Sequence, residues 1–463
     1  MRKFVVAFLI LVILIALAQY TKPALSVSDQ FERARIAGEI TETGNFPASF
    51  EIYGTELPYV YPPLFDIFSA AAGITTGLDV ALLWRLLSFV VLAIIFTYTY
   101  KFSHNFLDRN FALMAAVLTA LLPWVFKRTA AIIPESIGLA IFIMLLYYLH
   151  KKNFLAIAVL MPLLMLTHLR SFGTFTLIFL AVIAYLLFLR TWETDEQRER
   201  LALMRKTALA FLPAIVFGAY WIFPRLAALN MGGGANPWVD VVDLIGMFSW
   251  LWVIALVPAL ALLWKKPKHM LNLIFIFGML FALAFGATNF GFRELAYLFF
   301  PVAFLCATLL QWTKENAGAN WSIGLFALFV LVLLLPNFTW IQQESYFSEQ
   351  NLSAVRALNK IQGENVLADY MLSYAVPLYT EKHIVIGPFM EQVPGAGERA
   401  VKTHGFYEQC LANRVNVARY YPDFVAFTPY IRDVMHCSGD EFNSREWNLL
   451  YDNGTVKWHS PAN

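Results

Sequence analysis

Acidic side chains beside apolar segments are the residues of this chain whose types and spacing best suit chemistry. The first is Asp29, in the polar segment 28–33 that follows an apolar run at the N-terminus. At helical spacing Asp29, Glu32 and Arg33 share one face of a helix, where a carboxylate can act as a general base or bind a metal ion. The same spacing also fits a helix start, because Asp at the cap with Glu three residues later is a capping box. The local sequence leaves both interpretations open.

Glu135 is the second candidate, and it follows Pro134 immediately before the apolar segment 136–149. One interpretation is structural, because a proline in the first turn and an acid near the positive end of the helix dipole both stabilise a helix. However, a carboxylate next to hydrocarbon is costly and usually marks a functional site. We therefore interpret Glu135 as a candidate catalytic or metal-binding residue.

Several other polar side chains are suited to binding an anionic substrate. Arg293 begins an apolar segment, where it can anchor a helix at the membrane interface or grip a phosphate with its planar guanidinium. His168 and Arg170 lie at a tight turn between apolar segments, and such a histidine is either structural or a ligand. Asp66 lies in the ambiguous segment 60–77, where it can line a cavity or face lipid headgroups.

Composition and motifs exclude several classes of protein. The chain has 34 Lys and Arg against 32 Asp and Glu, which excludes a nucleic-acid binder that depends on bulk positive charge. Its 3 cysteines exclude a disulfide-dense scaffold and a multi-cysteine zinc fold. The patterns G-x-x-x-x-G-K-S/T, H-E-x-x-H, G-x-S-x-G and C-x-x-C are absent, so nucleotide hydrolysis and zinc-dependent proteolysis are unsupported.

The elements that must position these residues are membrane-spanning helices. Hydrophobic residues make up 59% of the chain and charged residues 14%, against roughly 45–50% and about 25% in soluble domains. About eleven segments approach the length of about 20 apolar residues that a span needs. They are 4–21, 80–100, 110–126, 136–149, 153–169, 171–189, 207–224, 243–264, 270–287, 294–312 and 320–338. The first can be a retained anchor or a cleaved signal peptide, and its length favours the anchor.

The distribution of the basic residues predicts how these segments are oriented in the membrane. If 60–77 is an interfacial helix, every second loop collects the lysines and arginines, including those of the connector 190–206. This arrangement follows the positive-inside rule and places the N-terminus inside and the C-terminus outside. If 60–77 spans the membrane instead, the basic clusters fall outside. We therefore predict a long first outer loop, 22–79, with helices near 29–43 and 62–77.

The composition changes to that of an ordinary soluble domain in the last quarter of the chain. Short β-type runs alternate there with helix-type segments, which predicts a small α/β domain. The β-type runs are 365–370, 383–387 and 423–428. The predicted organisation is therefore an all-α polytopic membrane domain, 1–340, followed by an extracytoplasmic α/β domain, 341–463. Cys410 and Cys437 both lie in the second domain, where they can pair or remain free thiols.

Several short motifs follow one another on the predicted outer side of the membrane. The first is Asp29 with the segment 44–47 at the end of the predicted helix, and the next two are the segments 61–65 and 84–86. The later ones are Arg128 with Glu135, the segment 166–168, and Arg293 with Tyr297, Leu298 and Pro301. Their order resembles the GT-C superfamily of integral membrane glycosyltransferases. This superfamily includes the oligosaccharyltransferase catalytic subunit, protein O-mannosyltransferases and lipid A aminoarabinose transferases. The resemblance covers about residues 1–340.

Two features depart from the family pattern. Glu135 stands where an aspartate is commoner. The tail has no Trp-Trp-Asp-type motif, which leaves oligosaccharyl transfer to Asn sequons unsupported. The resemblance thus identifies a superfamily and no subfamily, and the acceptor stays open between a protein, a lipid and a glycan.

The resemblance implies a reaction at the outer membrane face. A sugar linked to a polyprenyl phosphate would lie in the bilayer, and Asp29 would act as the general base for attack on the anomeric carbon. Glu135, with Asp29 or His168, would hold a divalent Mg, Mn or Zn ion or complete the acidic site. Inversion at the sugar is also implied by the family.

Basic residues would stabilise the departing phosphate in this reaction. The resemblance gives that role to Arg293 with Arg128 or Arg170, while Glu32 and His168 would contact the substrate. The implied partners are the lipid-linked donor, an acceptor and membrane lipid, without nucleic acid. The alternative is a lipid or polysaccharide transporter or flippase component, which would need polar residues deep inside its spans. The candidate residues lie at the predicted outer face instead, which favours an enzyme of the cell membrane.

Overall fold

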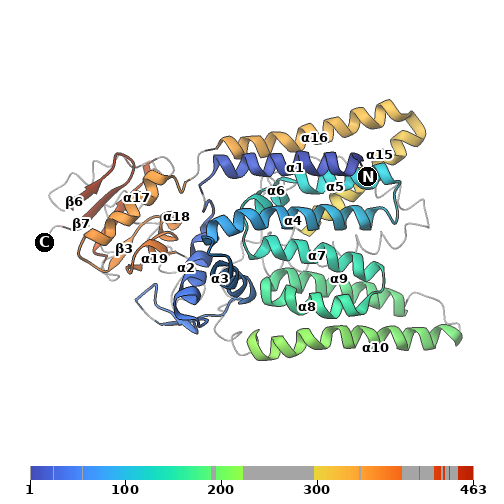
Figure 1. Ribbon diagram of the computed structural model, residues 1–463, viewed down its shortest axis with the longest axis horizontal. Coiled ribbons are helices and arrows are strands. Elements are labelled where there is room, and N and C mark those ends of the chain that lie inside the picture. The colour runs from blue at the N-terminus through green and yellow to red at the C-terminus, as the bar shows by residue number, and fades with distance from the viewer. Residues whose placement is uncertain are drawn as a thin grey trace.

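The computed structural model describes residues 2–23, 25–54, 56–188, 194–222, 297–343, 346–387, 406, 422–428, 431–432, 437 and 447–461. In this part of the chain, apolar helices lie side by side and roughly parallel, and a small sheet lies at one end of them (Figure 1). The two helices of the first outer loop, α2 (Ser28–Thr43) and α3 (Leu64–Thr76), lie at the same end as the sheet.

Three of the described helices are long and apolar enough to cross a membrane, and a bent pair would make a fourth. The three are α1 (Arg2–Thr21), α4 (Val80–Ser103) and α16 (Ala319–Gln342), and the pair is α5 (Arg109–Leu121) with α6 (Pro123–Ala130). The pair bends by 65°, because Leu122 precedes a proline and leaves the helical conformation. The single span predicted at 110–126 is therefore broken in two.

The remaining helices overlap predicted segments, although the helix over the segment 207–224 begins within the charged connector 190–206. They are α7 (Pro134–His150), α8 (Phe154–Thr167), α9 (Leu169–Phe188), α10 (Thr194–Phe217), followed by the π-helical turn Gly218–Ile222, and α15 (Phe299–Ala317). A helix is thus confirmed at each of these places, whereas the spans predicted at 243–264 and 270–287 lie outside the described residues. The total number of spans and the orientation of the chain stay predictions.

The first outer loop contains the two helices that its sequence predicts. α2 matches the stretch 29–43 and α3 matches 62–77 to within two residues. Both helices end at a glycine with a positive φ, 71° at Gly44 and 68° at Gly77, a conformation that glycine adopts without strain. The 13 residues of α3 extend over about 20 Å, less than the roughly 30 Å of the hydrocarbon core. This length agrees with an interfacial helix.

The tail folds into a mixed sheet that short helices cover. Among the described residues the order of its five strands is β4-β3-β5-β7-β6, with β3 parallel to β4 and β5, and β7 antiparallel to β5 and β6. The elements are α17 (Glu349–Ala357), the 3-10 turn Leu358–Lys360, β3 (Asn365–Leu367), α18 (Tyr370–Ser373), α19 (Val376–Tyr379), β4 (His383–Ile384), β5 (Phe424–Phe427), β6 (Trp447–Asp452) and β7 (Lys457–Pro461). The strands predicted within 365–370, 383–387 and 423–428 are confirmed, and the β6–β7 hairpin adds to them.

The structure shows the bonding state of one cysteine of the tail, Cys437. Cys437 is disulfide-bonded, and its partner lies outside the described residues, because the other described cysteine, Cys306, is free and buried. The alternative of a free thiol at Cys437 is therefore wrong. The bond agrees with an oxidising compartment for the tail.

The tail packs directly against the first outer loop. The ring of Phe347 lies 4.4 Å from the ring of Phe31 in α2, measured between centroids. The backbone N–H of Ile384 in β4 donates a 2.7 Å hydrogen bond to the carbonyl oxygen of Ile52. The tail therefore helps to hold α2, the helix that carries Asp29.

Candidate active site

Asp29 lies in the first turn of α2 with its side chain exposed. The helix start is capped by Gln30, whose Oε1 accepts hydrogen bonds from the backbone N–H groups of Ser26 (2.8 Å) and Val27 (3.3 Å). The interpretation of Asp29 and Glu32 as a capping box is therefore wrong. Within the described part of the chain the Asp29 carboxylate makes no hydrogen bond or ion pair, so it is available at the positive end of the helix dipole.

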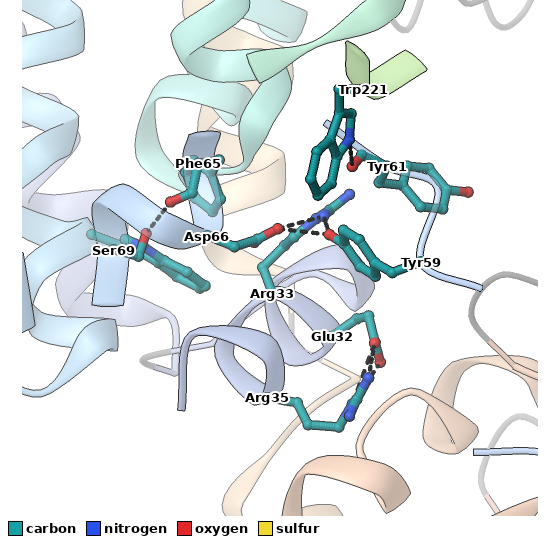
Figure 2. Close-up of polar contacts among 10 residues, drawn as sticks. Glu32, Arg33, Arg35, Tyr59, Tyr61, Phe65, Asp66, Ser69 and Trp221 are labelled. Carbon is teal, nitrogen blue, oxygen red and sulfur yellow. Dashed lines mark hydrogen bonds and ion pairs between the residues drawn. The ribbon is translucent and has the colours of Figure 1, made fainter. Parts of the chain in front are cut away.

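A buried ion pair fixes α2 to α3. The guanidinium Nη1 of Arg33 lies 2.9 Å from Oδ2 of Asp66, and the hydroxyl of Tyr59 donates a 2.6 Å hydrogen bond to the same oxygen. Arg33 also donates to the Tyr59 hydroxyl and lies over the ring of Tyr61, 5.0 Å from its centroid. Figure 2 shows these side chains converging between the two helices, with Trp221 donating to the Tyr61 carbonyl. The cluster holds the face of α2 next to Asp29 in one position.

Asp66 is wholly buried, with 0% of its surface exposed. Burial raises the pKa of this carboxyl, while the charge of Arg33 and the Tyr59 hydroxyl lower it. Its second oxygen, Oδ1, is buried and has no hydrogen-bond partner among the described residues. The alternative in which Asp66 faces lipid headgroups is therefore wrong, because this side chain points into the protein.

Glu32 takes part in a separate ion pair. Its Oε1 lies 2.7 Å from Nη2 of Arg35, and Arg35 also lies 3.3 Å from Glu39 one turn later. Figure 2 shows this pair apart from the Arg33–Asp66 cluster. The carboxylate of Glu32 is thus already satisfied, and a role in substrate binding stays a prediction that this pairing does not favour.

Glu135 and Arg128 form an ion pair across the turn between α6 and α7. Nε of Arg128 lies 3.0 Å from Oε2 of Glu135, and both side chains are mostly buried. Ser136 fixes this turn, because its hydroxyl donates a 2.6 Å hydrogen bond to the Arg128 carbonyl and accepts one from the backbone N–H of Ile133. The guanidinium of Arg128 also covers the ring of Trp124. The structure thus brings together Arg128 and Glu135, which the sequence analysis pairs in one motif.

His168 occupies the one-residue break between α8 and α9. Its Nδ1 lies 2.6 Å from the hydroxyl of Ser171 and 3.3 Å from the hydroxyl of Tyr297, and these two hydroxyls are hydrogen-bonded to each other. The network holds the ring through Nδ1. Its other nitrogen, Nε2, is therefore the one that can meet a ligand.

The charges that act on His168 show which candidates the fold brings together. Burial lowers the pKa of His168, three positive charges lower it further, and one negative charge opposes them. These charges belong, in order of effect, to Arg170, Arg128, Arg33 and Asp29. The imidazole is therefore neutral at physiological pH, within electrostatic range of arginines from α2, α6 and α9 and of the Asp29 carboxylate. Arg293 lies outside the described residues.

Comparison with solved structures identifies the fold of this chain. No protein-family model and no curated sequence matches this chain. Among solved structures, the oligosaccharyltransferase of Archaeoglobus fulgidus in its apo form superposes with a TM-score of 0.64 at 12% identity, over 99% of this chain and 74% of that one. ArnT from Cupriavidus metallidurans bound to undecaprenyl phosphate gives 0.56 at 12% identity, over 99% and 98% of the two chains. The mycobacterial arabinofuranosyltransferase AftD gives 0.55 at 14% identity, over all of this chain and 40% of that one.

All three neighbours are GT-C glycosyltransferases. The chain has the GT-C fold. This confirms the fold that the order of the motifs indicates. Because the three neighbours are different kinds of transferase, the fold identifies no subfamily.

The GT-C fold here shows no metal site among the described residues. No three His, Cys, Asp or Glu side chains in this part of the chain lie close enough to hold an ion. Glu135 is engaged by Arg128, and Asp29 is exposed. The described residues therefore do not fit a divalent ion, and the predicted metal-binding role of Asp29 and Glu135 stays a prediction without a described ligand set.

One part of the site is not indicated by helical spacing. That spacing predicts Arg33 on the face of Asp29, but it does not pair this arginine with Asp66 or Tyr59. A signal was present, because a carboxylate within an apolar segment needs a cation or hydrogen-bond donors when it is buried. Arg33 is a basic residue of the neighbouring predicted helix, and that makes it a natural partner.

Because α7 packs closely against α9, one added methyl group at Gly138 is expected to reduce stability strongly. A Cβ atom at Gly138 would lie 2.6 Å from the Ser171 hydroxyl oxygen and 3.0 Å from Cβ of His168. We expect Gly138→Ala to lower the free energy of unfolding by about 1–3 kcal/mol, as overpacking usually does, and to displace His168. Thermal unfolding of the purified protein measures this.

Gly173 provides a matched control on α9. A Cβ atom there meets nothing within 4 Å, so Gly173→Ala should be neutral or stabilise the helix by about 0.5–1 kcal/mol. Equal unfolding temperatures for the Gly138 and Gly173 variants would contradict the described packing around His168.

Proposed function

We propose that the chain is an integral membrane glycosyltransferase that moves a sugar from a polyprenyl-phosphate-linked donor to an acceptor at the outer membrane face, with inversion. The observation that carries this proposal is that Asp29 and arginines of α2, α6 and α9 act electrostatically on the same residue, His168, in a GT-C fold. The neighbours support the donor class. ArnT has been solved bound to undecaprenyl phosphate, and the archaeal oligosaccharyltransferase with a dolichol-phosphate.

In the proposed reaction the carboxylate of Asp29 accepts the proton of the acceptor nucleophile. The nucleophile forms a bond to the anomeric carbon from the face opposite the phosphate. The bond between that carbon and the phosphate oxygen breaks, and its electron pair leaves with the phosphate. An exposed carboxylate without another partner among the described residues suits this role, because it is ionised and can accept a proton from the nucleophile.

The arginines would stabilise the leaving phosphate in this reaction. Arg128 and Arg170 act on the same histidine as Asp29 does, and fixed cations aimed at developing negative charge lower the barrier to such a transfer. Arg33 has a different role, because Asp66 and Tyr59 already hold it. We assign Arg33 to positioning α2, and with it Asp29.

Reconstituted protein tests the proposed function directly. Liposomes that contain the protein and a polyprenyl-phosphate-linked radioactive sugar should release polyprenyl phosphate when membrane extract supplies acceptors. Movement of the intact donor across the bilayer without cleavage would instead support the transporter alternative. Failure to cleave any lipid-linked sugar would overturn the proposed enzyme.

The orientation of the chain is part of the proposal. Glu42 on α2 and His104 after α4 are both exposed, and the proposed topology places residue 42 outside and residue 104 inside. A membrane-impermeant maleimide should therefore label Glu42→Cys in intact cells and His104→Cys only after permeabilisation. The parent chain is the control, and the reverse pattern would overturn the proposed outer site.

A further inference from the structure

A hollow lies where the three long apolar helices end together. Its lining residues come from the end of α1, the segment before α2, the start of α4, the turn after α6 and the end of α16. They include Gln19, Lys22, Gln30, Trp84, Arg85 and Trp340. Neither Asp29 nor Glu135 lines it, so the hollow is separate from the candidate active site.

Lys22 is a buried cation in this hollow, with 8% of its surface exposed. Its Nζ donates to the carbonyl oxygen of Gln343 and lies 5.1 Å from the centroid of the Trp340 ring. Within the described part of the chain it makes no ion pair. Burial of a charge without a counter-ion is costly, and burial indeed lowers the pKa of Lys22. The charge of Lys22 therefore has no counter-ion among the described residues.

Arg85 adds a second cation beside Lys22. Its Nη2 donates a 2.9 Å hydrogen bond to the Lys22 carbonyl oxygen, and it too makes no ion pair in the described part of the chain. No acidic side chain of the described residues lines the hollow. Gln19 does not compensate these charges, because its amide donates to Ser88 and to two carbonyl oxygens. Two cations thus face a hollow for which the described residues provide no anion.

The position of the hollow indicates the chemistry of its ligand. The ends of α1, α4 and α16 meet here, and the ends of spanning helices lie at the level of the lipid headgroups. Trp84 and Trp340 line the same hollow, as tryptophans commonly do at this level. A phosphate is the anion present there at high concentration, and Arg with Lys is a frequent pair of ligands for it.

We propose that this hollow is a second, non-catalytic site that binds the phosphate group of a membrane phospholipid between Lys22 and Arg85. The phosphate supplies the missing counter-ion, and the acyl chains extend along the apolar faces of α1 and α4. Residues exposed on those faces include Leu17 and Leu82. The bound lipid would join the three helix ends, and binding does not depend on sugar transfer.

Native mass spectrometry of the protein from phosphatidylcholine nanodiscs with added phosphatidylglycerol tests this site. The wild type should retain one phosphatidylglycerol, and Lys22→Gln or Arg85→Gln should reduce its affinity about tenfold, as loss of a charge-assisted hydrogen bond usually does. Lys22→Arg should keep the lipid. Lys101→Gln is the matched control, because Lys101 is an exposed lysine at the opposite end of α4.

A second arm distinguishes a lipid from a free ion. Inorganic phosphate is titrated into pure phosphatidylcholine nanodiscs while the thermal unfolding temperature is followed. A phosphate-induced increase that needs Lys22 and Arg85, without retained lipid, would overturn the phospholipid and leave a free phosphate as ligand. Equal lipid retention by the wild type and the folded Arg85→Gln variant, with no response to phosphate, would overturn the site itself.

Discussion

Replacing Asp29 by asparagine is expected to reduce sugar transfer by about 10²–10⁴-fold, the usual contribution of a general acid or base. The amide keeps the size of the side chain and cannot accept the proton of the nucleophile. Stability should hardly change, because the carboxylate is exposed and Gln30 caps the helix in its place. Release of polyprenyl phosphate from the labelled donor measures the effect.

Glu42 provides the control for this experiment. It is exposed on the last turn of the same helix, so Glu42→Gln removes an equal charge from α2 without touching the site. It should retain full transfer. If Asp29→Asn is equally active, Asp29 is not the base, and the proposed mechanism fails even if the chain proves to be a transferase.

Replacing Asp66 by asparagine should destabilise the protein strongly. Removing one partner of a buried ion pair leaves the other charge uncompensated and typically costs about 3–5 kcal/mol. Arg33, with 8% of its surface exposed, is the charge that would remain. We expect a large decrease in the unfolding temperature and loss of transfer, because α2 would no longer be fixed to α3.

A double-mutant cycle distinguishes the interaction energy of the Arg33–Asp66 pair from the separate destabilisation caused by each substitution. Arg33→Met should cost about as much as Asp66→Leu, whereas the variant with both changes should recover much of the loss, since no buried charge is left. Asp108→Asn is the control, because this exposed aspartate makes no cap hydrogen bond. Additive losses in the cycle would contradict the described ion pair.

Much of the first outer loop could be predicted because its signals are local. A glycine lies at the end of each predicted helix, and the described helices end there, at Gly44 and Gly77. The break at Leu122 is also local in origin, since Pro123 follows it. The apolar composition of 110–126 concealed it, because hydropathy counts residues and does not detect a change of direction.

The parts that were not predicted depend on contacts distant in the sequence. Arg33 meets Asp66 33 residues later, and spacing on one helix cannot indicate which face of another helix it meets. The capping role passed from Asp29 to Gln30 because the helix begins at Ser28, after Val27, so that Gln30 and not Glu32 is its third residue. The β6–β7 hairpin was detectable, since Asn453 and Gly454 form a favoured two-residue turn signal.

The contact between the tail and α2 determines when, during synthesis, α2 can be held in its final position. The partner of Phe31, Phe347, follows more than three hundred positions later, and Ile384, the partner of Ile52, also belongs to the tail. The helix that bears Asp29 therefore acquires this support only after the intervening helices have been synthesised. Biosynthesis thus delays the final placement of Asp29 until the tail has been made.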